Sequence, residues 1–240
     1  MDETLTRRLV TRWRLYLWSV GGGLVAAGLV VSTAFDPGTL TPTTRTAVRA
    51  TAGEFYPGLA WPHAAGLVMA LYQGPYLVGL FGAILGFSLA SVLVHGWQFG
   101  SVTTATELDH DADRATVESV LAVVGVHGVV LTTAASLPTL AFFTVQKSLV
   151  NPFGAWVVLG PVVAVGCALA GGLALVAAGL VGDAVARGAV ALFAFAPPLA
   201  GIQVAHVAPT RHLRVGLAGT GLLLAVFGLV GWRLVVQRTA

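Results

Sequence analysis

Residues 59–97 read LAWPHAAGLVMALYQGPYLVGLFGAILGFSLASVLVHGW and contain no Asp, Glu, Lys or Arg. About 20 apolar residues in a helix cross the hydrocarbon core of a bilayer, so this stretch is far longer than one span needs. Gln73-Gly74-Pro75 interrupts it, and proline removes a backbone donor. We therefore expect an interfacial or re-entrant segment over 59–72 and a span over 74–96. Aromatic residues near the interruption suit the belt at a membrane interface: Trp61, Tyr72 and Tyr76.

The composition of the whole chain is that of a membrane protein. Of its 240 residues, 56% are hydrophobic and 10% are charged, against about 45–50% and about 25% in soluble domains. At about 20 residues per span, the apolar residues suffice for about six spans. A soluble enzyme, a nucleic-acid-binding module and a disordered chain are thereby excluded. The sequence predicts one all-α, polytopic membrane domain over residues 1–240, in contact with lipid and not with nucleic acid.

Five further apolar runs complete the expected set of six spans. The run over 186–208, the fifth expected span, contains Pro197-Pro198, so we expect either a kinked span or a helix that ends near this pair and continues as a short re-entrant piece. The runs cover residues 15–35, 119–145, 153–181, 186–208 and 213–232.

The segments between the runs indicate the topology. Residues 4–18 (TLTRRLVTRWRLYLW) combine apolar positions at helical spacing with several Arg. They predict an amphipathic helix in the interface or, equally, a positively charged flank of the first span. More Lys and Arg fall on the inner side if the N-terminus lies inside. We expect a multi-pass protein of the cell membrane with both termini cytoplasmic, an external loop over 36–58 and a cytoplasmic loop over 98–118.

Several kinds of chemistry are missing from the sequence. The sole Lys, Lys147, precedes Ser148 but follows FFTVQ, so the chain has no P-loop for ATP. It contains neither H-E-x-x-H nor G-x-S-x-G, and its apolar runs lack the carboxylates typical of ion-coupled pumps. The single Cys167 allows no disulfide within the chain and no cysteine-based metal site. We expect no catalytic residue, metal or cofactor.

The most polar stretch of the chain, residues 98–118, leads into an apolar helix. Residues 111–116 (DADRAT) and 117–122 (VESVLA) resemble the stretch after the second span in membrane subunits of ABC-2-type ABC transporters. That stretch consists of charged residues, Gly-Thr, a Leu-rich helix and a Pro with basic residues. Ala115 stands here in place of the Gly, and Val124 in place of the Pro. The topology expected for the whole chain also resembles this family.

The resemblance implies a permease subunit of an ATP-driven exporter, which is a transporter component and not an enzyme. It implies a separate ABC ATPase subunit that docks on the cytoplasmic loop, and a second permease subunit in a homodimer or heterodimer. The residues implied in coupling to the ATPase are Glu107, Asp111, Asp113, Arg114, Thr116 and Glu118.

Two smaller features allow other interpretations. Asp183 and Arg187, in the turn GDAVARG, pair across one helical turn or contact the ATPase. His95 and His127 flank the cytoplasmic loop, and as a pair at similar depth they predict an alternative, a haem- or quinone-associated membrane subunit. The other interpretation of both histidines is as interfacial residues without a ligand.

Overall fold

The computed structural model of the protein describes residues 13–36, 38–61, 63–95, 114–145, 163, 165–167, 169–170 and 195–203. All of these residues are helical except 36, 38–41 and 56–61. Four helices have defined bounds, and no strand occurs within the described residues, which agrees with the all-α prediction. The helices are α2 (Trp13–Phe35), α3 (Pro42–Phe55), α4 (His63–His95) and α5 (Arg114–Val145).

Three of these helices are long and apolar enough to cross a membrane. Their candidate spans are Trp13–Phe35, His63–Leu89 and Leu121–Phe143. They correspond to the first three predicted spans, and α5 contains Pro138 as expected. The predicted spans over 153–181, 186–208 and 213–232 fall largely outside the described residues, so the number six stays a prediction.

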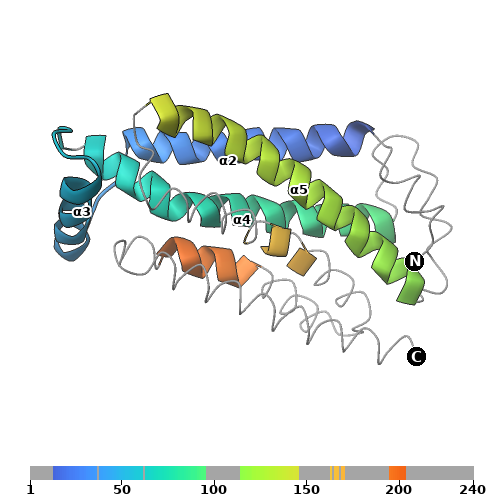
Figure 1. The fold of residues 1–240 in the computed structure, drawn as a ribbon. Coiled ribbons are helices and arrows are strands. Elements are labelled where there is room, and N and C mark those ends of the chain that lie inside the picture. Colours follow the sequence, from blue (N-terminus) through green and yellow to red (C-terminus); the bar gives the residue numbers. More distant parts are fainter. Residues whose placement is uncertain are drawn as a thin grey trace.

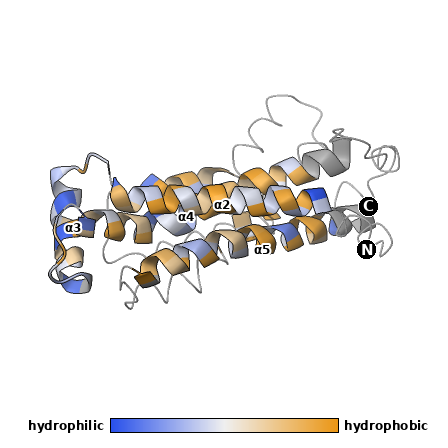
Figure 2. Cartoon of the chain, turned by 90° about the horizontal axis from the view of Figure 1, so that it is seen from above, coloured by the Kyte–Doolittle hydropathy of each residue, from blue (hydrophilic) through white to orange (hydrophobic). Residues whose placement is uncertain are grey.

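The three spans lie side by side, with α4 the most enclosed. Helix α2 packs against both α4 and α5, which also contact each other. The chain runs in one direction along α2 and α5 and in the other along α4 (Figure 1). In the most apolar stretch of each span, 72% of the residues are buried in α4, 39% in α5 and 28% in α2. Hydrophobic residues occur along the length of the spans (Figure 2), and each span has exposed large hydrophobic side chains, among them Leu24, Ile84 and Val129, as a helix in contact with lipid requires.

Helix α4 is continuous through Pro75, so the prediction of a separate re-entrant segment over 59–72 is wrong. A proline inside a membrane helix is tolerated because neighbouring helices and local adjustments cover the carbonyl that it leaves free. The helical residues 195–203 pack closely beside the proline. A Cβ added to Gly201 would collide with the ring of Tyr76, the residue that follows Pro75.

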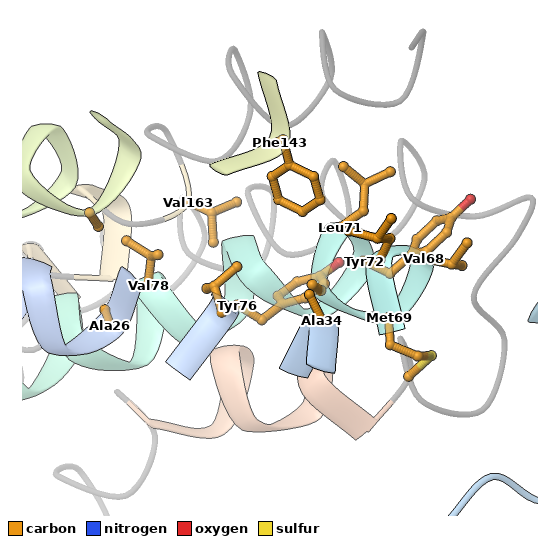
Figure 3. Close-up of a cluster of buried hydrophobic side chains, with 14 of the residues drawn as sticks. Ala26, Ala34, Val68, Met69, Leu71, Tyr72, Tyr76, Val78, Phe143 and Val163 are labelled. Atoms are coloured by element: carbon orange, nitrogen blue, oxygen red, sulfur yellow. The ribbon is translucent and has the colours of Figure 1, made fainter. Parts of the chain in front are cut away.

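The core of the bundle forms around the middle of α4. Tyr72 and Tyr76 are each 3% exposed, and they lie near Leu71, Phe143 and Val163 (Figure 3). The surrounding segments enclose both rings, and their predicted place in an interfacial aromatic belt stays a prediction. The third member of that prediction, Trp61, does lie just before the start of α4.

The connection expected over 36–58 contains a helix. Thr41 caps α3, since its hydroxyl accepts a hydrogen bond from the Thr44 backbone N–H at 3.2 Å, and Pro42 occupies the first helical position. Figure 1 shows α3 lying across the end of the bundle at which α4 begins. Val48 and Ala52 are buried in the same core cluster as α4 residues.

The structure describes only part of the segment over residues 4–18 that was predicted as an amphipathic helix or a charged flank of the first span. Residues 13–18 belong to the same continuous helix as the first span, so no break separates them from it. Residues 4–12 lie outside the described residues.

Candidate functional site

The residues predicted to couple to an ATPase lead into the N-terminus of α5. Arg114 is the first residue of α5, and Thr116 and Glu118 follow within its first two turns. Glu118 is half-buried. The other three predicted residues lie outside the described part of the chain: Glu107, Asp111 and Asp113.

Three helix termini lie at the end of the bundle where α5 begins. The beginning of α5, the beginning of α2 and the C-terminal end of α4 lie together, and α3 lies at the opposite end (Figure 1). Arg14 is exposed here, with its guanidinium 5.8 Å from the ring centroid of Trp13. Asp183 and Arg187 fall outside the described residues, so their pairing stays a prediction.

A buried polar cluster connects α2 and α5 within the spans. His127 of α5 is fully buried, and its Nδ1 lies 3.0 Å from Oγ of Ser19 on α2. The Ser19 hydroxyl donates to the carbonyl of Leu15 at 2.9 Å. The only hydroxyl hydrogen of Ser19 serves one of these two contacts; when it serves Leu15, Nδ1 of neutral His127 carries the imidazole hydrogen and donates it to Ser19 Oγ.

This tautomer leaves Nε2 of His127 as a lone-pair acceptor. Nε2 is buried and has no hydrogen-bond partner among the described residues. The ring of Tyr16, three residues before Ser19 on α2, lies 4.7 Å from the imidazole, centroid to centroid, at 58°. We call Tyr16, Ser19 and His127 the α2–α5 polar cluster.

The α2–α5 polar cluster joins two helices. In a serine–histidine pair that activates a nucleophile the imidazole accepts the hydroxyl proton, whereas in the tautomer described above it donates to Ser19. The hydroxyl of Ser19 is also committed to the Leu15 carbonyl. The arrangement therefore joins two helices by a hydrogen bond in an apolar setting.

The alternative based on two histidines depends on a common depth and stays a prediction. His95 is the last residue of α4, at the end of the bundle where α5 begins. His127 lies 13 residues after Arg114, the first residue of α5, which corresponds to about 20 Å along that helix. No group of three or more His, Cys, Asp or Glu suited to a metal occurs among the described residues.

A close helix contact lies one turn beyond the α2–α5 polar cluster. A Cβ added to Gly23 of α2 would lie 2.8 Å from Cβ of Ala134 and 3.0 Å from the backbone nitrogen of Ala135. It would also collide with the carbonyl oxygen of Leu131. Glycine at position 23 therefore sets how closely α2 approaches α5.

Sequence reasoning singled out His127 but not its partners. Tyr16 and Ser19 lie three residues apart and so share one side of α2. That spacing was visible in the sequence, but which helix this side faces depends on tertiary packing.

The chain was compared with known proteins in three ways. No family model matches it, and neither a curated protein nor a solved structure matches it.

Proposed function

We propose that the chain is the membrane-spanning permease subunit of an ABC-2-type exporter, driven by ATP hydrolysis on a separate subunit. One structural observation supports this best. The polar segment before Arg114 leads into α5 at the end of the bundle that also carries the start of α2. A partner that binds this segment would act, through α5, on the spans.

Helix α5 suits the transmission of motion from such a partner. It is continuous over 32 residues, which corresponds to about 48 Å. A displacement of its first turn is therefore carried into the membrane by one rigid element. Its contacts with α2, at the polar cluster and at Gly23, couple that displacement to the first span.

The remaining parts of the proposal concern the assembly. Two permease subunits, identical or different, surround the path of the cargo, and a rocking movement driven by the ATPase opens it. The protein resides in the cell membrane with both termini cytoplasmic, and the end of the bundle that carries α3 faces outward. ATP hydrolysis takes place on the partner chain.

Co-purification from native membranes tests the proposal. Tagged full-length protein is expected to retain a P-loop ATPase in mild detergent, and the Asp111→Asn/Asp113→Asn variant is expected to lose it. Glu54→Gln is the matched control, since it neutralises an exposed carboxylate on α3 at the opposite end of the bundle. Absence of any P-loop ATPase from the wild-type preparation, or equal retention by the double variant, contradicts the proposal.

A further inference from the structure

Helix α3 carries two arginines on its exposed side. Arg45 and Arg49 are four residues apart and both exposed, so their side chains are neighbours on the helix surface. Helix α3 crosses the end of the bundle, at the level where α2 ends and α4 begins (Figure 1). Since those two helices are candidate spans, this is the level of the lipid headgroups on that side.

The two arginines do not stabilise α3 itself. Like charges four residues apart destabilise a helix by a few tenths of a kcal/mol. Arg45 also lies close to the N-terminus of α3, where the helix dipole disfavours a positive charge. No carboxylate occurs three or four residues from either arginine, and within the described residues no ion pair joins them to an acidic group. An anion placed between the two guanidinium groups offsets both the repulsion between them and the unfavourable interaction of Arg45 with the helix dipole.

A neighbouring aromatic ring positions one of the two groups. The guanidinium of Arg49 lies over the ring of Trp61, 5.2 Å from its centroid. A stacked guanidinium uses its face for the aromatic contact and keeps the N–H donors along its edge, where a phosphate binds in a bidentate manner. Trp61 is half-buried just before α4, so it anchors Arg49 to the start of that span.

We propose that Arg45 and Arg49 bind the phosphate of an anionic phospholipid in the leaflet at the α3 end of the bundle. The depth of α3 favours a lipid over a soluble anion, because headgroup phosphates are the anions concentrated at that level. Complementary charge and the edge donors of the stacked Arg49 supply the recognition. The buried side of α3, which includes Val48 and Ala52, attaches the site to the core. This proposal does not depend on an ATPase partner.

Lipid binding to the purified full-length protein in detergent tests the proposal by native mass spectrometry. The probes are palmitoyl-oleoyl phosphatidylglycerol and its zwitterionic phosphatidylcholine counterpart. We expect tighter binding of phosphatidylglycerol and about 25-fold weaker binding after Arg45→Gln/Arg49→Gln, since each interfacial arginine contributes about fivefold. Trp61→Leu, which leaves both charges in place, should weaken binding by about twofold to fivefold.

Two controls separate charge from helix structure. Arg45→Lys/Arg49→Lys keeps both charges but removes the bidentate edge donors, so its affinity is expected to fall between those of the wild type and the Gln variants, whereas Thr46→Gln, on the same exposed side, should change nothing. The single Arg49→Gln variant, expected at about fivefold weaker binding, replaces the double variant if that variant does not fold. Wild-type affinity for phosphatidylglycerol in the Gln variants overturns the proposal. So does displacement of the lipid by inorganic phosphate at equal concentration, which would indicate a soluble anion as the ligand.

Discussion

Replacing Gly23 with alanine tests the contact between α2 and α5. The new Cβ would lie 2.8 Å from Cβ of Ala134 and 3.0 Å from the backbone nitrogen of Ala135, whereas carbon atoms in ordinary contact are about 3.5–4.0 Å apart. It would also collide with the carbonyl oxygen of Leu131. Two of these three neighbours are backbone atoms, which no change of rotamer moves. Helix α5 must therefore shift by about 1 Å.

The expected change in the free energy of unfolding follows from the cost of overpacking the contact between α2 and α5. Forcing an extra carbon into a packed interface costs about 1–3 kcal/mol, while alanine favours a helix over glycine by up to about 1 kcal/mol. Gly21→Ala isolates the second effect, since a Cβ at Gly21 has no neighbour within 4 Å. The expected result is that Gly23→Ala unfolds more readily than Gly21→Ala by about 1–3 kcal/mol.

The assay is reversible unfolding of the purified protein by sodium dodecyl sulfate in mixed micelles, followed by circular dichroism. Gly28→Ala serves as a second control, because a Cβ at that position also has no neighbour within 4 Å. Free energies of unfolding that agree within about 0.5 kcal/mol for Gly23→Ala and Gly21→Ala would refute the reasoning, since independent surface changes typically fall within that range.

Three further changes test other contacts. Gly66→Ala should destabilise the protein in the same assay by about 1–3 kcal/mol, because a Cβ there collides with the backbone of Ala34; an unchanged unfolding curve would contradict the close approach of α2 and α4. A double-mutant cycle with Ser19→Ala and His127→Leu should give a coupling energy of about 0.6–1.7 kcal/mol, whereas additive effects would show that no hydrogen bond joins the two side chains. Thr41→Ala should accelerate amide hydrogen exchange in α3 by about fivefold, through the loss of about 1 kcal/mol of capping, and Thr41→Ser should not; equal rates in both variants would exclude the cap.

The sequence predicted the spans well where apolar runs are uninterrupted. The first expected span, 15–35, corresponds to Trp13–Phe35, and the third, 119–145, lies within α5. Length and hydropathy suffice in these cases, because lipid requires a helix wherever an apolar run of this length crosses the bilayer.

Local signals failed where tertiary packing decides the outcome. Pro75 was interpreted as a boundary, but closely packed neighbours allow α4 to continue through it. Helix α3 was missed because its residues lack a strong apolar pattern, although Thr41-Pro42 is a recognisable start signal.

In the candidate site, too, the sequence indicates a single residue but not the partner that tertiary packing brings to it. The sequence identified His127 as an unusual residue of a span, but its partner Ser19 lies 108 residues away. Such a pair depends on how α2 and α5 are rotated about their axes relative to each other. The spacing of residues along the sequence does not predict this rotation. The coupling residues at the start of α5 were predicted from resemblance alone, and that prediction awaits the co-purification experiment.

The central place of α4 has a consequence for the order in which the protein assembles during synthesis. A Cβ on Gly79 of α4 would lie 3.2 Å from Sγ of Cys167 and 3.3 Å from Val163, and Tyr76 faces Gly201. When α4 leaves the ribosome, α2 and α3 have been made, but Val163, Cys167 and Gly201 have not. The side of α4 that carries Tyr76 and Gly79 therefore lacks these partners until the later residues are made, and lipid or an insertion factor must cover it meanwhile. A chain that stops before residue 163 would present the Tyr76 and Gly79 surface to the membrane.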